Sequence, residues 1–309
     1  MPELEIIDIH THTFASADRG ISWQQSIGHA TPARDGTIEV LLDLMERTGT
    51  SNSVMLMYTP TRFMFQARIR NRELPTDPGE REQVEREIQG LMVQRMIDNN
   101  EWAVGVSAND PRLHTFLGLD PVYMDAETMV GEIEDKQRKG AKGAKIVPLA
   151  LAVYVDDERL WPAYQKLAEL GLPLISQAGA GGETGDRGDP YGCPKYFSKV
   201  MDDFPDLKIN IAHLGHGYED DVIELCRRSP NFYADLSGRL AEIEDPDEEL
   251  TAESLVEFIR QCGADHIMFG TNYPMGDLEQ YARVMRSLPL TDEEKELVAN
   301  GNAKTLLGI

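Results

Sequence analysis

Short apolar runs alternate with amphipathic stretches along the whole chain. The apolar runs have the length and continuity of buried strands, and they cover residues 4–9, 53–57, 114–119, 143–147, 172–177, 207–213, 231–236 and 266–271. Between them, apolar positions recur at helical spacing, which predicts helices over residues 38–47, 83–99, 126–139, 157–170, 194–204, 218–228, 252–262, 278–288 and 292–307. Residues 13–36 and 68–86 lack this periodicity and are predicted to be a long loop and a surface excursion.

This alternation predicts the fold class. Strands that are apolar on both faces are typical of parallel sheets covered by helices. The chain has 309 residues, and no linker or internal repeat divides them. Eight strands that alternate with helices over this length therefore predict an α/β fold, a single (β/α)8 TIM-barrel domain spanning residues 1–309.

The charge of the chain limits its partners. Acidic residues number 53 and basic residues 30, so the formal net charge is -23. This charge repels nucleic-acid phosphates and anionic membranes, and we expect neither as a partner. The three cysteines have no disulfide or metal-site spacing. No leader pattern and no membrane-length apolar run is found, which predicts a cytoplasmic protein that acts on a small molecule.

Two histidines lie at the end of the first predicted strand. Because side chains alternate along a strand, His10 and His12 project to the same side, with Cα atoms roughly 6–7 Å apart. Two imidazoles at this separation can bind one metal ion. The carboxyl ends of barrel strands are also where active sites lie.

Polar side chains end most of the other predicted strands as well. They are Asp120, Lys145, Gln177, His213, Asp235 and Asn272. A buried ring of polar groups is unfavourable unless its members are paired or used. The pattern therefore predicts an active site at this end of the barrel.

The chain resembles the amidohydrolase-related family of the amidohydrolase superfamily, a group that includes aminocarboxymuconate-semialdehyde decarboxylase and γ-resorcylate decarboxylase. The resemblance rests on six segments in order, residues 8–12, 143–148, 170–173, 212–215, 269–274 and 301–303. It implies a distorted (β/α)8 barrel with one divalent metal ion, usually zinc. It also suggests a homodimer.

The resemblance assigns roles to individual residues. His10 and His12 match metal ligands, and His213 matches the histidine that orients or protonates near the metal-bound water. Gln177 stands where the family usually has a histidine ligand, and Asn272 stands where it has an aspartate that binds metal and acts as a base. An amide carries no negative charge and accepts no proton from water.

These two departures leave two possibilities for the metal. Either the ion is held weakly with the help of another acid, or no metal binds. The acids that could complete a site are Asp120, Glu183, Asp186 and Asp235.

The resemblance leaves Lys145 with two interpretations. In related members of the superfamily, a lysine at this position can be carbamylated and bridge two metal ions. The structural alternative, which we favour, places Lys145 inside the barrel and paired with a carboxylate. Arg62 and Arg239 follow the second and seventh strands and are predicted to bind a substrate carboxylate.

Two hypotheses follow for function. The first is an enzyme that hydrolyses a C–N or C–O bond, or decarboxylates, in a small carboxylate-bearing or cyclic substrate. His213, Asn272 and Lys145 would act in catalysis, and His10, His12 and Gln177 would form the altered metal site. The alternative is a catalytically silent relative that binds a small molecule or a partner.

Overall fold

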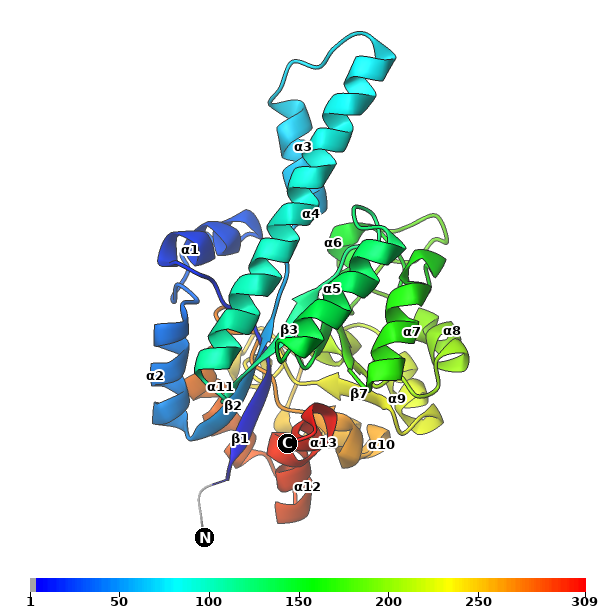
Figure 1. Ribbon diagram of the computed structural model, residues 1–309. Helices are drawn as coiled ribbons and strands as arrows, with labels where there is room; N and C mark the ends of the chain where they lie inside the picture. The colour runs from blue at the N-terminus through cyan, green and yellow to red at the C-terminus, as the bar shows by residue number, and fades with distance from the viewer. Residues whose placement is uncertain (1–3) are drawn as a thin grey trace.

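The computed structural model describes residues 4–309, and Figure 1 shows strands surrounded by helices, with a two-helix arm projecting from the body. The strands are β1 (Ile6–Thr11), β2 (Thr50–Leu56), β3 (Leu113–Gly118), β4 (Gly143–Ile146), β5 (Leu174–Ser176), β6 (Ile209–Ile211), β7 (Phe232–Asp235) and β8 (Ile267–Met268). They form one sheet in the order β1 to β8, and each pairs in parallel with the next. The predicted (β/α)8 barrel is confirmed.

The barrel closes between β1 and the segment that follows β8. The Ile9 N–H donates to the Phe269 carbonyl at 3.1 Å, and the Asn272 N–H donates to the His10 carbonyl at 2.8 Å. Since β8 itself has only two residues, this following segment supplies the seam. The seam fixes Asn272 next to the histidine-bearing end of β1.

Helices follow most strands, as the periodicity predicts. The α-helices are α1 (Ala17–Ser26), α2 (Ile38–Thr48), α3 (Thr61–Arg70), α4 (Pro78–Asn109), α5 (Ala126–Arg138), α6 (Pro148–Leu151), α7 (Trp161–Leu170), α8 (Phe197–Asp203), α9 (Glu219–Arg228), α10 (Ala252–Cys262), α11 (Leu278–Ser287), α12 (Asp292–Glu296) and α13 (Asn302–Leu307). Short helical turns are η1 (Glu158–Leu160), η2 (Pro194–Tyr196), η3 (Ala212–Gly215), η4 (Glu242–Glu244), η5 (Ala264–His266) and η6 (Leu297–Gly301).

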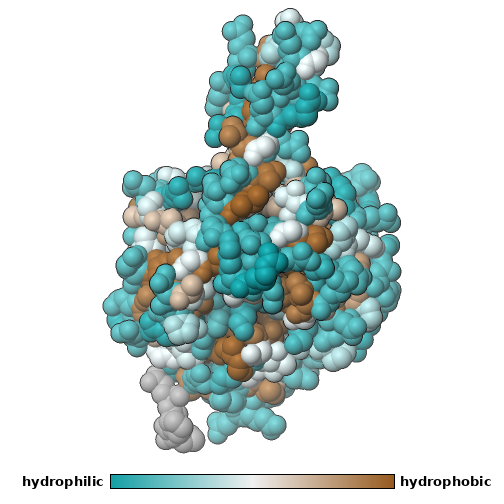
Figure 2. Space-filling model, viewed as in Figure 1, coloured by the Kyte–Doolittle hydropathy of each residue, from teal (hydrophilic) through white to brown (hydrophobic). Residues whose placement is uncertain are grey.

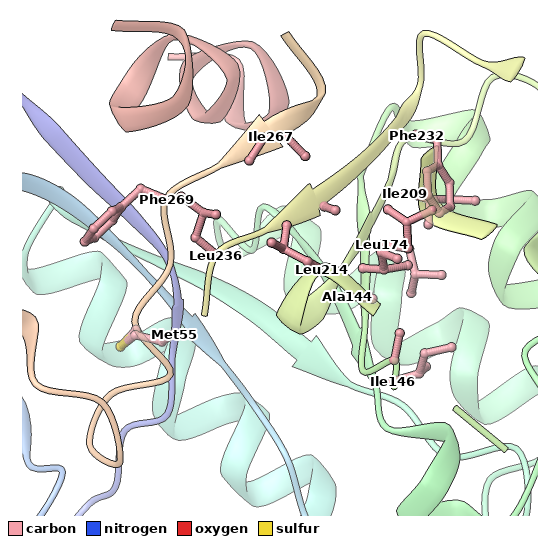
Figure 3. Close-up of a cluster of buried hydrophobic side chains, with 14 of the residues drawn as sticks. Met55, Ala144, Ile146, Leu174, Ile209, Leu214, Phe232, Leu236, Ile267 and Phe269 are labelled. Atoms are coloured by element: carbon pink, nitrogen blue, oxygen red, sulfur yellow. The ribbon is translucent and has the colours of Figure 1, made fainter. Parts of the chain in front are cut away.

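Two apolar layers hold the barrel together. The larger one lies between the strands and the surrounding helices, and Figure 3 shows part of it, including Met55, Ala144, Ile146, Leu174, Ile209, Phe232 and Ile267. The smaller one joins strand residues to the last helix and contains Ile7, Ile9, Val54, Leu56, Phe116, Ile175, Tyr233, Met268, Ala303, Leu306 and Leu307. Because α13 packs against the barrel in this way, the polar residues are left to the opposite end.

The projecting arm consists of α3 and the first part of α4, whose later part packs against β3, and it differs from the sequence prediction in its boundaries. Helix α4 begins at Pro78, where the Asp77 carboxylate accepts the Glu80 N–H at 2.9 Å. An aspartate cap followed by proline is a strong start signal, so the helix starts inside the predicted excursion and runs to Asn109. The predicted loop 13–36 likewise contains a helix, α1. Figure 2 shows that the visible surface of the arm is mostly hydrophilic.

Among residues 4–309, no helix is both long enough and apolar enough to cross a bilayer.

Candidate active site

A cavity of about 400 Å³ lies at the carboxyl end of the barrel. It is lined by seven of the predicted site residues, His10, His12, Arg62, Lys145, Gln177, His213 and Asn272. Apolar and aromatic side chains form much of the remaining wall, among them Trp23, Tyr58, Phe63, Val147, Leu149 and Met275. The strand ends therefore bring together residues that are far apart in the sequence, in a cavity of the size of a small-molecule site.

Asp235, the last residue of β7, is the centre of a buried hydrogen-bond network. Its Oδ2 accepts from Asn210 Nδ2 at 2.8 Å and lies 3.1 Å from His10 Nδ1. Its Oδ1 accepts the backbone N–H groups of His213 and Ser237 at 3.2 and 3.0 Å. Burial alone would raise the pKa of this carboxyl, but the attraction of His10 and the hydrogen bonds outweigh burial and lower it. Asp235 is therefore ionised.

Ser237 links two of the histidines to this network. Its Oγ donates to Asp235 and lies 3.0 Å from His10 Nδ1 and 2.9 Å from His213 Nδ1. His213 Nδ1 also donates to the Ser237 carbonyl at 2.9 Å, and His12 Nδ1 donates to the Leu56 carbonyl at 3.2 Å. These acceptors fix the proton on Nδ1 and leave the Nε2 lone pair of each ring available.

The three histidines are neutral at pH 7. Burial is the largest cause in each case, and it lowers the pKa of His10 to about 3, of His12 well below its ordinary value, and of His213 as well. The ring centroid of His10 lies 5.3 Å from that of His12 and 5.1 Å from that of His213. The cluster therefore presents closely spaced neutral imidazoles, which can accept a proton or bind a ligand.

Unusual backbone conformations place two of the site residues. His213 and Asn272 have positive φ angles of 61° and 64°, in the left-handed region that residues other than glycine seldom adopt. His213 lies two residues after the end of β6 and Asn272 four residues after the end of β8, so the chain turns sharply where these side chains enter the cavity. Asparagine tolerates this conformation better than most residues.

Lys145 lies inside the barrel, with only 2% of its surface exposed. Within residues 4–309 its amine has no hydrogen bond and no ion pair, so the predicted carboxylate partner is absent. Asp235 is the acid that acts on it electrostatically, but the oxygens of Asp235 are taken by Asn210, Ser237 and the histidines. Burial lowers the pKa of Lys145 to about 8.

A family model described as amidohydrolase matches residues 7–309. The chain belongs to the amidohydrolase family. A γ-resorcylate decarboxylase from Polaromonas sp. is 21% identical over 195 residues, which cover 51% of this chain and 57% of that enzyme. The match thus spans little more than half the length of this curated relative. As a member of this family, the chain is an enzyme.

Two solved structures of decarboxylases share the fold of this amidohydrolase. The 5-carboxyvanillate decarboxylase from Sphingomonas paucimobilis has a TM-score of 0.72 at 18% identity, over 99% of both chains. A dihydroxybenzoic acid decarboxylase from Polaromonas sp., determined with bound manganese, has a TM-score of 0.69 at 16% identity, over 98% of this chain and 97% of that one.

The residues of this amidohydrolase do not fit a tightly held divalent metal. Among residues 4–309, no group of three or more His, Cys, Asp or Glu side chains is placed to hold an ion. Beside His10 and His12, the matching positions supply only the amides of Gln177 and Asn272. Amide oxygens are weak ligands for zinc, which prefers nitrogen, thiolate and carboxylate. Of the two amides, Gln177 has a side-chain oxygen, Oε1, that is buried and has no hydrogen-bond partner.

The acidic residues that could replace the missing metal ligands do not all lie in the cavity. Glu183 lines the cavity, but it pairs with Arg62 at 2.8 Å. Asp120 and Asp186 are not among the described residues that line it. Asp120 instead accepts from the Thr61 hydroxyl and from the Val122 N–H, so it anchors the first residue of α3.

The two arginines that were predicted to bind a substrate carboxylate lie in different places. Arg62, on α3, lines the cavity together with its partner Glu183. Arg239 lies outside this cavity, in another pocket, where its guanidinium contacts His216 and lies 3.2 Å from Glu242. The prediction that Arg239 borders the same site is wrong because the chain after β7 turns its side chain toward η4.

A second cavity of about 410 Å³ adjoins the first and shares His12, Trp23 and Tyr58 with it. Arg95 and Asn99, from α4, lie on its wall. The indole Nε1 of Trp23 is buried and lacks a hydrogen-bond partner. Sequence reasoning missed Arg95, as it missed Ser237. Only Ser237 carried a usable signal, since it lies two residues beyond the strand-ending Asp235.

Proposed function

We propose that this amidohydrolase decarboxylates a small carboxylate-bearing substrate in the 400 Å³ cavity, without a tightly held metal ion. The observation that carries the proposal is the placement of Lys145, a buried amine without a partner among the described residues, beside three neutral histidines. A substrate carboxylate would supply the missing countercharge. The decarboxylases among the relatives support this reaction over hydrolysis.

The cavity walls suit the loss of carbon dioxide. Trp23, Leu149 and Met275 are among the side chains that surround the polar cluster. In such surroundings a carboxylate is poorly solvated, whereas neutral carbon dioxide is not disfavoured. The Lys145 ammonium stabilises the electron pair left on carbon.

Protons would move through the histidines. His12 and His213 each keep Nδ1 engaged with a carbonyl and leave Nε2 free. A neutral imidazole held in this way can take a proton from the substrate or from water and return it. Arg62, at the side of the cavity, would orient a second polar group of the substrate.

The test measures release of carbon dioxide from a panel of hydroxybenzoates and small oxo acids, with chelator present. We expect turnover that Lys145→Met reduces at least about 100-fold, within the usual range for losing an electrostatic catalyst. Lys142→Met is the matched control, since the Lys142 amine lies 3.4 Å from the Leu307 carbonyl on the other side of the barrel. Turnover that appears only with added metal would contradict the metal-free reaction. Binding of carboxylates without any turnover would favour the silent relative.

The remaining expectations concern the oligomeric state and the cellular location of the protein. We propose a homodimer and a cytoplasmic location. Light scattering on the purified protein tests the first, and a molar mass of one chain, 34.6 kDa, would contradict it. Fractionation of source cells tests the second.

A further inference from the structure

The position of Lys145 poses a problem that an electrostatic role alone does not solve. A buried ammonium without a countercharge is strongly disfavoured, and buried lysines in proteins are usually paired. Here Asp235, the acid that acts on Lys145 electrostatically, already accepts hydrogen bonds from other donors, and Lys145 lines a cavity of about 400 Å³. The barrel thus holds a buried amine that faces space for a ligand.

A neutral amine in such a place is a nucleophile. Lysines become reactive toward carbonyl groups when an apolar pocket or a neighbouring cation favours the uncharged form. The first condition holds for Lys145, since burial lowers its pKa to about 8 and apolar side chains such as Val147 and Ala150 line the same cavity. At mildly alkaline pH, a large share of the amine is therefore uncharged.

We propose that Lys145 Nζ forms an imine with the ketone of a β-oxo carboxylate, which makes this substrate class the one that the cavity decarboxylates. The proposal rests on the decarboxylation proposed above and specifies its chemistry. The imine replaces the metal ion as the group that accepts electrons, which accounts for the amides of Gln177 and Asn272 at positions where a metal site needs stronger ligands.

The steps balance without any further reagent. The amine nitrogen attacks the carbonyl carbon and a C–N bond forms. The carbonyl oxygen then leaves as water after taking two protons, one that the amine loses and one from solvent, which leaves the imine protonated; the final hydrolysis returns the solvent proton. The C–C bond to the carboxylate then breaks, its electron pair moves toward the protonated imine, and carbon dioxide leaves. The enamine carbon takes a proton, and water hydrolyses the imine to release the ketone and restore the amine.

Neighbouring residues are placed to assist these transfers. His213 holds its Nδ1 proton on the Ser237 carbonyl, so Nε2 is free to accept the proton that the amine loses. Gln177 Oε1 is a buried acceptor without a partner, and it can bind the hydroxyl of the addition intermediate. Each of these groups lines the same cavity as Lys145.

The test traps the imine chemically. The full-length protein is incubated with acetoacetate and sodium cyanoborohydride at pH 8, and intact mass and peptide mapping locate the product. We expect one reduced adduct per chain, on the peptide that carries Lys145. In Lys145→Arg, which keeps the positive charge, this adduct should disappear. Lys142→Arg should keep it.

Other outcomes overturn the proposal. Labelling spread evenly over exposed lysines, or no adduct at Lys145, would exclude the imine with this substrate class. A label of 44 Da without reductant would indicate carbamylation and would also exclude it. If Lys145→Arg retains a tenth or more of the decarboxylation rate, the lysine acts only through its charge.

The same samples separate this inference from the proposed function. Release of carbon dioxide without an adduct would exclude the imine mechanism but would still support decarboxylation. An adduct without carbon dioxide release would support a reactive lysine and contradict decarboxylation.

Discussion

The two sides of the cavity differ in how their polar groups are paired. On the side of β6 and β7, Asn210 and Ser237 hold the Asp235 carboxylate, which in turn holds His10. On the side of β4 and β5, the described residues give the Lys145 amine and Gln177 Oε1 no hydrogen-bond partner. The β6–β7 side thus has a carboxylate with several partners, although Asn210 Oδ1 lacks one, whereas the β4–β5 side has an amine and an amide oxygen that a ligand could pair.

This difference separates support from chemistry. A buried carboxylate that accepts several hydrogen bonds holds its partners in one geometry. Asp235 therefore lets the β6–β7 side position the histidines, and Asn210 Oδ1 is the acceptor that this network leaves without a partner. Unsatisfied buried groups are unfavourable in the free protein, and a ligand that pairs them recovers that free energy. We therefore expect substitutions on the first side to change stability and those on the second to change binding and catalysis.

The largest effect should come from Asp235→Ala. The substitution removes the acceptor of His10, Asn210 and two backbone N–H groups, so we expect a loss of about 3–5 kcal/mol in the free energy of unfolding. Denaturant unfolding measures it. Asp203→Ala is the control, because that carboxylate pairs with Lys199 at the surface, where about 1 kcal/mol or less is expected. Equal losses would remove the distinction between the two sides.

The next largest effect should come from restoring a metal site on the β4–β5 side of the cavity. Gln177→His together with Asn272→Asp supplies an imidazole and a carboxylate beside His10 and His12. We expect the affinity for zinc to rise at least about 100-fold, which corresponds to about 3 kcal/mol. Calorimetry and elemental analysis compare the double variant with the unmodified chain. Stoichiometric metal already in the unmodified chain would contradict the poor fit described above.

A smaller effect concerns the pH dependence of stability. The pKa of Lys145 is about 8 in the folded protein and about 10.4 in the unfolded chain, so between these values the unfolded state binds more protons. Stability should therefore rise with pH across this window, by on the order of 1–3 kcal/mol. Lys145→Met should remove this rise, because it removes the titrating group, whereas Lys142→Met should leave it. A parallel pH profile for Lys145→Met and the unmodified chain would show that the amine is not buried alone.

Much of the fold was predictable from local pattern. Continuous apolar strands alternating with helices predicted the barrel, and the Gly171 left-handed end of α7 was visible in the sequence. The start of α4 was missed, although Asp77 and Pro78 signal it, because the charged stretch around them masked the helical period. Strands β6 and β8 are shorter than predicted: they end at Ile211 and Met268, before the backbone turns at His213 and Asn272.

The sequence predicted which residues form the candidate site, but it did not predict which side chains bind one another there. Strand ends placed His10, Lys145 and His213 together because all parallel strands of a barrel end on one rim. Which side chain takes which partner depends on distances that spacing along the chain does not give. Lys145 was expected to pair with an acid, and Arg239 was expected in the cavity. Both errors arose at residues whose side-chain direction is set by tertiary contacts.

The smallest expected effect on the free energy of unfolding gives the sharpest test of the difference between the two sides, because it compares two substitutions of amide side chains. Asn210 and Gln177 are both amides whose side-chain oxygen is buried without a partner, but Asn210 Nδ2 donates to Asp235 at 2.8 Å, whereas the Gln177 side chain has no hydrogen bond among the described residues. Asn210→Leu leaves a carboxylate oxygen short of a donor and should lower the free energy of unfolding by about 1–3 kcal/mol. Gln177→Met breaks no side-chain hydrogen bond among the described residues and should change the free energy of unfolding by less than about 1 kcal/mol, because an unsatisfied polar group is replaced by an apolar one of similar shape. Thermal unfolding of the two variants, side by side, decides between a paired and an unpaired side, and a larger loss for Gln177→Met would reverse the assignment.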